Sequence, residues 1–433
     1  MKTQIYILFI LLLFSIKSYS QDYDFSNYST KSNSITNNQT YFPLLYSPKL
    51  NMRTGEETIT SIHKGVTYFE DKLIGTKWFS EKSILGKMAG ITGRLTKYTL
   101  LDIPVDYFSV ILGHEFFGHG SRYREFNIDG IHYSFMLPPP YGKGGGESSK
   151  NGALPVSYHQ LLSIWSGGVE IHPGINRVLS LRWMSRNEMS YREASQYFWS
   201  FQIFITYIQD TKEDLFDGTS DNDIRAYTRI INAQAVYTEP DNIKMSVKDL
   251  KSKMMINAVN PFLFYSLYSM IKTYLLDGNQ SNEVPMISFG DVKYLPSLRA
   301  GFTPFGIEYH LDNYIILKNI TSLIDIRYGD KTFYNTWGGV GIYIQNIKRL
   351  TRFSFDVNLN IWKQPGLKFG NDKAELKGRG IGGAFSIRGY YDFPNTEIPV
   401  SAILELGYKS IGFQEGYSLD SSPILALGLA LRY

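Results

Sequence analysis

The chain contains no cysteine among its 433 residues. Disulfide bonds and lipid attached through cysteine are therefore excluded, and any stabilising crosslink must come from a metal ion or from ordinary packing. The chain also lacks a strong excess of one charge. Its net charge is +4 with lysine and arginine scattered, so nothing indicates nucleic acid as a partner.

Long hydrophobic runs are also scarce. The segments 197–208 and 261–276 are strongly apolar, but they are short and are interrupted by Gln202 and Lys272. A membrane-spanning helix needs about 20 consecutive apolar residues. We therefore interpret both segments as buried core helices, with membrane-crossing helices as the alternative.

The first residues have the pattern of an export signal. Lys2 precedes an apolar run from Ile5 to Phe14, and the small-x-small segment Ser18–Ser20 follows. A charged start, a short apolar stretch and small residues at a cleavage site are typical of a signal peptide. We predict a signal peptide over residues 1–20 and an exported protein. An uncleaved membrane anchor is the alternative.

The chain then divides into three regions by pattern. Residues 21–79 are predicted to be a polar segment followed by short strands, for example over 58–69. Residues 80–280 are predicted to be mainly helical, with a helix starting at Asp102–Pro104 and another running from Ser157 to Ile171 before Pro173. A glycine-rich loop over 138–152 is expected to be irregular and to edge a cleft. Further helices are predicted near 190–209, 222–236, 246–256 and 260–276.

Residues 281–433 alternate between apolar and polar positions. In the last segment the apolar residues on one face are Leu425, Leu427, Leu429 and Leu431. We find about eight such segments, which predict an antiparallel β-barrel. The high aromatic share of 15% and the aromatic end at Tyr433 make this region similar to bacterial outer-membrane β-barrels. The resemblance implies membrane lipid around the barrel; a soluble β-sandwich shows the same alternation. The fold class predicted for the whole chain is α+β.

The segment His114–His119, with the sequence His-Glu-Phe-Phe-Gly-His, has the residue types of a metal site. Zinc hydrolases use neutral imidazoles, a third protein ligand and an open position for water. A glutamate beside the first histidine can take a proton from that water. We therefore predict that His114 and His119 bind Zn²⁺ and that Glu115 is the catalytic base.

The spacing of the two histidines requires a distorted helix. In the usual motif the histidines are four residues apart and lie on one helical face. Here they are five apart, which on a regular helix separates them by roughly 140°. We therefore predict a one-residue bulge, of the kind found at functional sites, near Gly118.

The motif His-Glu-x-x-Gly-His resembles the zinc motif of the dipeptidyl peptidase III family of metallopeptidases, and the following Gly120 and Ser121 extend the match. The resemblance covers about eight residues. It implies that the histidines are ligands, that Glu115 is the base, and that a glutamate on a later helix is the third ligand. The best candidate is Glu170, in a segment with Gly167 and Gly168 that would let two helices pack closely. The paired glutamates of the family are absent, so His172 and His159 remain alternatives.

An acidic run at Asp214, Asp217, Asp221 and Asp223 lacks the spacing of a calcium-binding loop. We interpret it as a solvated loop, in which Asp221 or Asn222 caps the next helix.

Three functional hypotheses follow. The leading one is an exported zinc metallopeptidase, anchored in or at the outer membrane with its catalytic region in the periplasm, that hydrolyses peptides or proteins through a metal-bound water. The second is a non-catalytic outer-membrane protein with a structural metal. The third is an intramembrane protease built on apolar helices.

Overall fold

A computed structural model of the chain describes residues 41–74, 83–136, 146–149, 154, 156–212, 222–236, 244–318, 320–347, 352–370, 375–394 and 400–432. The predicted signal peptide and most of the polar segment that follows it lie outside these residues.

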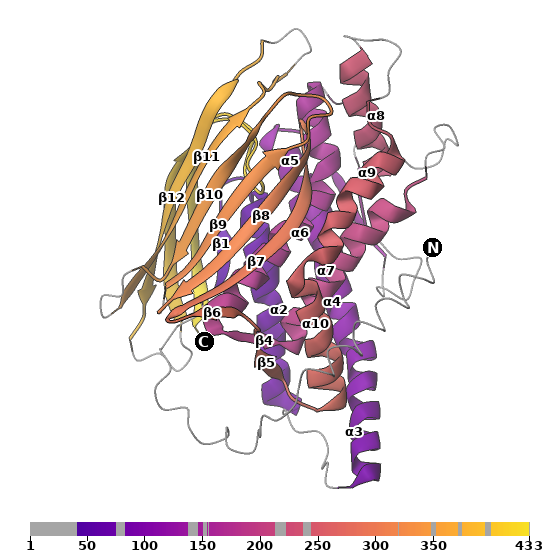
Figure 1. The fold of residues 1–433 in the computed structure, drawn as a ribbon, viewed down its shortest axis with the longest axis vertical. Helices are drawn as coiled ribbons and strands as arrows, with labels where there is room; N and C mark the ends of the chain where they lie inside the picture. Colours follow the sequence, from indigo (N-terminus) through magenta and orange to yellow (C-terminus); the bar gives the residue numbers. More distant parts are fainter. Residues whose placement is uncertain are drawn as a thin grey trace. The chain divides into compact units, whose positions relative to one another are not determined.

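A mainly helical region precedes a large antiparallel sheet (Figure 1). The helices are α2 (Met52–Ile74), α3 (Ile84–Lys97), η3 (Tyr98–Asp102), α4 (Ile103–Leu112), η4 (Gly113–His119), α5 (Gly120–Glu125), α6 (Tyr158–Arg186), α7 (Tyr191–Asp210), α8 (Asp223–Val236), α9 (Val247–Met254), η5 (Met255–Val259), α10 (Pro261–Tyr268) and η6 (Ser269–Leu276). The α+β prediction and the helices expected near 190–209, 222–236, 246–256 and 260–276 are confirmed.

The sheet has ten strands in the order β1-β14-β13-β12-β11-β10-β9-β8-β7-β6. Its strands are β1 (Tyr41–Tyr46), β6 (Ile287–Phe289), β7 (Val292–Thr303), β8 (Gly306–Leu317), β9 (Ile320–Gly329), β10 (Gly338–Gln345), β11 (Phe353–Gln364), β12 (Gly380–Asp392), β13 (Val400–Lys409) and β14 (Ser422–Arg432). The eight strands β7 to β14 match the predicted number. Two short two-stranded sheets lie outside the large sheet. One pairs β2 (His132–Phe135) with β3 (Gly146–Ser149), and the other pairs β4 (Glu188–Ser190) with β5 (Ser281–Glu283).

The predicted closed barrel is not found, because β1 and β6 are edge strands that do not pair with each other. Helices pack where closure would occur: α2 contacts β1, and η5 and α9 contact β7. Helix α6 contacts the sheet through β7, β8 and β9 and the helices through α2, α7 and α8. Most of its residues are buried, which makes it the central element of the fold.

The predicted alternation along the last strand is confirmed. Leu425, Leu427 and Leu429 are exposed on one face of the sheet, whereas Ala426 and Ala430 are buried on the other. A period of two residues places successive side chains on opposite faces of a strand. The pattern was therefore sufficient to assign both the strand and its two faces.

Two local predictions were wrong. Residues 58–69, predicted as a strand, lie in helix α2, because burial of Ile59 and its neighbours outweighs their β-branched side chains. The helix start predicted at Asp102–Pro104 agrees with the start of α4 at Ile103, although α4 continues a helical run that begins in α3 and passes through the widened turn η3. Pro173 does not end α6, which continues to Arg186. In a packed interior, tertiary contacts offset the hydrogen bond that proline cannot donate.

The apolar segments 197–208 and 261–276 lie in α7 and in α10 with η6. No helix among the described residues is long and apolar enough to cross a membrane by itself.

Candidate metal centre

The predicted bulge lies on the metal motif. Element η4 is a π-helical turn over Gly113–His119, and the backbone N–H of Gly120 donates to the carbonyl oxygen of Glu115, five residues earlier. A regular α-helix would make this bond to the residue four positions earlier. The wider turn brings His114 and His119 to one face of the helix, as the five-residue spacing required.

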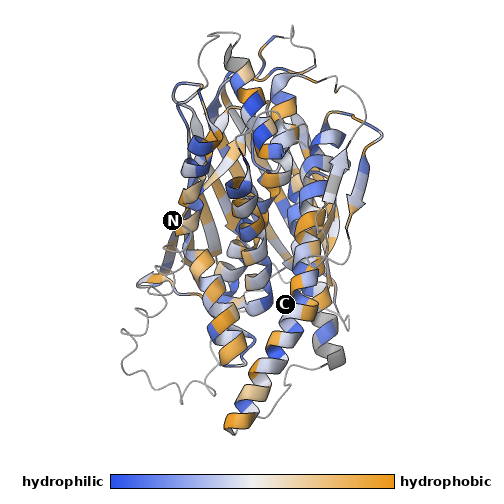
Figure 2. Cartoon of the chain, turned by 90° about the vertical axis from the view of Figure 1, so that its right-hand side faces the viewer, coloured by the Kyte–Doolittle hydropathy of each residue, from blue (hydrophilic) through white to orange (hydrophobic). Residues whose placement is uncertain are grey.

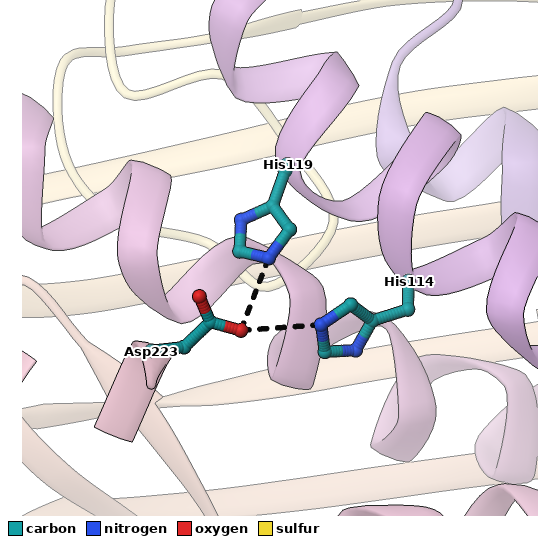
Figure 3. A group of neighbouring side chains, drawn as sticks. All are labelled: His114, His119 and Asp223. Atoms are coloured by element: carbon teal, nitrogen blue, oxygen red, sulfur yellow. Dashed lines mark hydrogen bonds and ion pairs between the residues drawn. The ribbon is translucent and has the colours of Figure 1, made fainter. Parts of the chain in front are cut away.

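The two histidines meet an aspartate from another helix (Figure 3). Asp223 Oδ2 lies 3.2 Å from His114 Nε2 and 3.1 Å from His119 Nε2. All three side chains are buried. The ligand atoms of a tetrahedral zinc ion, with bonds of about 2.0–2.1 Å, lie about 3.3 Å from one another. Each imidazole nitrogen is therefore spaced from the carboxylate oxygen as two ligands of one metal ion would be, and all three atoms lie within 4.8 Å of one another.

Hydrogen bonds at the far side of each ring orient the imidazoles. His119 Nδ1 lies 2.7 Å from the carbonyl oxygen of Ile164, which only accepts, so Nδ1 carries a hydrogen and Nε2 is the nitrogen that would bind a metal. His114 Nδ1 lies 3.3 Å from His172 Nε2, and His172 Nδ1 lies 3.3 Å from the hydroxyl of Ser200. Metal-binding histidines usually donate their second N–H in this way. The site therefore has the supporting contacts of a metal centre as well as the ligand atoms.

Two glycines, Gly118 and Gly168, make room for the site because they have no side chain. A Cβ atom added at Gly168 would lie 2.4 Å from Nε2 of both His114 and His119. A Cβ atom added at Gly118 would lie 2.7 Å from the carbonyl oxygen of Gly167. The predicted close packing of the two helices through Gly167 and Gly168 is thus confirmed, and Gly118 is needed for that approach.

Asp223 is the first residue of α8 and is held there by its neighbours. Asn222 Oδ1 accepts from the backbone N–H groups of Ile224 and Arg225, which confirms its predicted role as a helix cap. The hydroxyl of Tyr207 donates to Asp223 Oδ2 at 3.1 Å and accepts from the backbone N–H of Asp223 at 3.2 Å. Two contacts from one phenol therefore fix the carboxylate toward the histidines.

The charges of the three groups stabilise one another. Burial alone would lower the pKa of His119, but the Asp223 carboxylate, with a smaller contribution from Glu115, raises that pKa to about 9. Burial alone would raise the pKa of Asp223, but the two histidines lower it well below its ordinary value. Without a metal ion, the Asp223 carboxylate is therefore paired with a protonated His119.

Glu115 is also buried beside the site, with 7% of its surface exposed. A Cβ atom added at Gly146, in strand β3, would lie 2.5 Å from Glu115 Cγ. The described part of the glycine-rich loop, residues 146–149, therefore lies against the predicted base, and it forms a strand paired with β2 instead of the predicted irregular loop.

Glu170, the expected third ligand, lies elsewhere. Both of its carboxylate oxygens accept from Arg122 Nη2 at 2.7 Å, and Oε1 also accepts from the backbone N–H of Gly416 at 3.0 Å. A buried arginine needs a carboxylate partner, and Glu170 provides it. Asp223 takes the place that we predicted for Glu170.

The two alternative ligands also have other partners. His172 supports His114, as described above. His159 Nδ1 accepts from the backbone N–H of Lys368 at 3.1 Å, at the start of α6. Sequence reasoning missed Asp223 because it lies 104 residues after His119. The one feature of the sequence that could have indicated Asp223 as a ligand was its place in the acidic run, which we interpreted as a solvated loop.

A second buried cluster, of His310, Asp312 and Asp325, has the composition of a metal site but not its charge. Arg299 Nε lies 2.7 Å from Asp312 Oδ2, and Arg299 Nη2 lies 2.9 Å from His310 Nδ1. A guanidinium among these atoms would repel a metal ion. This cluster is an internal network of ion pairs.

Comparisons of the chain with protein-family models, curated proteins and solved structures find no match.

Proposed function

We propose that the chain is an exported zinc metallopeptidase whose metal is held by His114, His119 and Asp223. The observation that supports this proposal most is the 3.1–3.2 Å distance from Asp223 Oδ2 to both imidazole nitrogens, beside a glutamate that follows the first histidine. Two histidines and one carboxylate are a common ligand set of hydrolytic zinc sites. Resemblance to the dipeptidyl peptidase III motif agrees with both histidines but not with the residue type of the third ligand.

The residues fit zinc better than the harder cations. Calcium and magnesium prefer oxygen ligands, whereas two of the three atoms here are imidazole nitrogens. Bound zinc would polarise a substrate carbonyl and increase the acidity of a water molecule. Three protein ligands leave a position of the tetrahedron for that water or the substrate.

Glu115 is the residue that we assign to proton transfer. It follows His114 directly, lies inside the protein, and is close enough to His119 to influence its pKa. A positioned general base typically accelerates a reaction by about 10²–10⁴-fold. In the proposed reaction, Glu115 accepts a proton from the attacking water and passes it to the leaving amine.

The test uses the full-length chain, purified with zinc and incubated with a library of peptides. Glu115→Gln should keep the metal and lose about 10²–10⁴-fold in kcat/KM. Glu188→Gln changes an exposed glutamate and is the matched control. Equal cleavage by the wild type and Glu115→Gln would refute the role of Glu115.

The alternative is a structural metal, and one observation favours it. The ligands come from η4 and α8, which are distant in the sequence, so a bound ion would join two parts of the helical region. In that case the zinc-loaded chain would cleave no peptide in the library, and chelation would lower its unfolding temperature.

A further inference from the structure

The outer face of the sheet is covered by exposed aliphatic side chains. They occur in the middle of neighbouring strands, so they form one continuous surface; they are Leu298, Leu311, Ile326, Val340, Leu359, Ile387, Leu404, Leu406, Leu425, Leu427 and Leu429. Among the strand residues whose exposure is described, β7 to β14 have one exposed charged side chain, Lys363, near the end of β11. Large continuous apolar surfaces are rare on proteins that contact only water.

The inner face of the same sheet carries buried ion pairs beside apolar core residues such as Leu323. Arg388 Nη2 lies 2.6 Å from Glu405 Oε2, and Arg299 Nε lies 2.7 Å from Asp312 Oδ2; all four side chains are buried. Water-soluble proteins place apolar groups inside and charges outside. Charged interiors with apolar outer faces are typical of β-proteins that lie in a lipid bilayer.

Aromatic residues lie toward both ends of this surface. We call the end of the sheet at Thr303 the site end, because α8 packs there through a hydrogen bond from Tyr227 to the Thr303 carbonyl oxygen. Exposed Tyr328 and Tyr408 lie toward the site end, and exposed Phe353 lies at the other. Aromatic belts at both interfaces are characteristic of membrane proteins.

The strand lengths also fit a bilayer. Strands β7 to β9 and β11 to β14 each have 10–13 residues. A tilted strand needs about 9–11 residues to cross the hydrocarbon region.

The apolar surface continues from the sheet onto the helices. Exposed Ile62 and Val66 lie on α2, exposed Phe108 on α4 and exposed Ile271 on η6. An apolar groove between α2 and α4 is lined by Ile62, Val66 and Phe108 together with Ile59, Pro104 and Val105. Figure 2, which turns the helices toward the viewer, shows hydrophobic segments in the lower parts of several of them.

These helices connect the two edges of the sheet. At one edge of the sheet, helix α2 contacts β1, and α4 contacts α2. Helix α3 contacts η6. Toward the other edge, η5 contacts β7, the strand that pairs with the short edge strand β6. Glu56 and Glu57 of α2 are buried, and Glu57 pairs with Arg388 of the sheet at 2.7 Å. An amphipathic helix of this kind need not be apolar throughout in order to contact lipid on one side.

We propose that the sheet and these outer helices together form a single lipid-facing surface, and that its occupant is the hydrocarbon region of a bilayer. Helices, instead of further strands, complete the ring around the central helix α6. The apolar surface extends over both the sheet and the helices. A second copy of the chain would cover only one of these sides and would leave the other exposed to water, whereas a bilayer covers both. This proposal does not depend on the metal or on catalysis.

The absence of cysteine permits a direct test, because single cysteines can be introduced without background. Leu427→Cys and Leu311→Cys probe the sheet, and Ile62→Cys and Ile271→Cys probe the helices. Ser421→Cys and Lys331→Cys, which replace exposed polar residues, are the controls. Each full-length variant is spin-labelled and reconstituted in phosphatidylcholine vesicles, and its collisions with oxygen and with a water-soluble nickel chelate are measured.

Labels on both the sheet and the helices should show a severalfold higher ratio of oxygen to nickel collisions than the two controls. A high ratio on the sheet with a control-like ratio on the helices would overturn the proposed ring. Control-like ratios at all four positions would overturn lipid contact altogether. A second copy of the chain would shield the labels from both reagents, and this shielding would disappear when excess lipid separates the copies. That result would identify the second copy as the occupant and would also overturn the proposal.

Discussion

His119 donates its Nδ1 hydrogen to the carbonyl oxygen of Ile164 over 2.7 Å. This single contact with α6 selects the tautomer of His119 and aims Nε2 at Asp223. The π-helical turn η4 has the complementary effect, because it rotates His114 to the same face. The geometry of two helices thus places the two proposed histidine ligands side by side, and α8 supplies Asp223, the proposed third ligand.

The assignment of the third ligand can be tested with two isosteric variants. Asp223→Asn removes the anionic ligand, so zinc affinity should fall by more than the roughly 10–100-fold typical of losing a supporting contact. Glu170→Gln should keep stoichiometric zinc but lower the free energy of unfolding by about 1–3 kcal/mol, because buried Arg122 loses one of its two carboxylate partners and keeps the other, Glu125. Metal titration and denaturant unfolding separate the two effects. If Glu170→Gln lost zinc and Asp223→Asn kept it, the third ligand would be Glu170, as the sequence predicted.

A methyl group at Gly168 should abolish metal binding. The Cβ atom of Gly168→Ala would lie 2.4 Å from both imidazole Nε2 atoms, in the space that the ion needs. Gly65→Ala is the control, since a Cβ atom at this helical glycine of α2 meets nothing within 4 Å. We expect wild-type zinc content in Gly65→Ala and none in Gly168→Ala. Equal zinc content in both variants would place the metal elsewhere.

Tyr207 is expected to act as a positioning residue. Tyr207→Phe removes the hydroxyl that contacts both the carboxylate and the backbone N–H of Asp223. Zinc affinity should fall by roughly 10–100-fold, as for other supporting contacts. If the role were only structural, the unfolding temperature would fall while the affinity for zinc stayed unchanged, so both quantities are measured on the same preparation.

His159 should make the protein sensitive to mild acid. Burial, with a smaller contribution from Lys368, lowers the pKa of His159 to about 4, from an ordinary value of 6.5. Between these two values the unfolded chain binds a proton that the folded chain does not, so stability falls as the pH decreases from 6.5 to 4. The shift corresponds to about 3 kcal/mol.

The matching variant is His159→Asn, which retains an acceptor for the backbone N–H of Lys368. The difference in unfolding free energy between pH 7 and pH 4 should be smaller in this variant than in the wild type. His132→Asn changes an exposed histidine and is the control. An identical pH dependence in the wild type and His159→Asn would contradict the assignment.

The sequence by itself determined those features that depend on local spacing. The five-residue spacing of His114 and His119 required a widened helical turn, and period-two alternation assigned the strands and the outward face of Leu425, Leu427 and Leu429. Both predictions succeeded because side-chain direction follows directly from the rise and rotation of a helix or a strand.

Only the tertiary structure decided which distant residues meet. Asp223 reaches the histidines, and Glu170 pairs with Arg122, because α6 packs on η4 and α8 packs on α6 in a particular register that no local pattern encodes. The same is true of the open sheet: alternation describes one strand at a time, whereas closure depends on whether β1 meets β6 or, as found here, a helix. Long-range packing therefore set the ligands of the proposed metal and the shape of the surface that we assign to lipid.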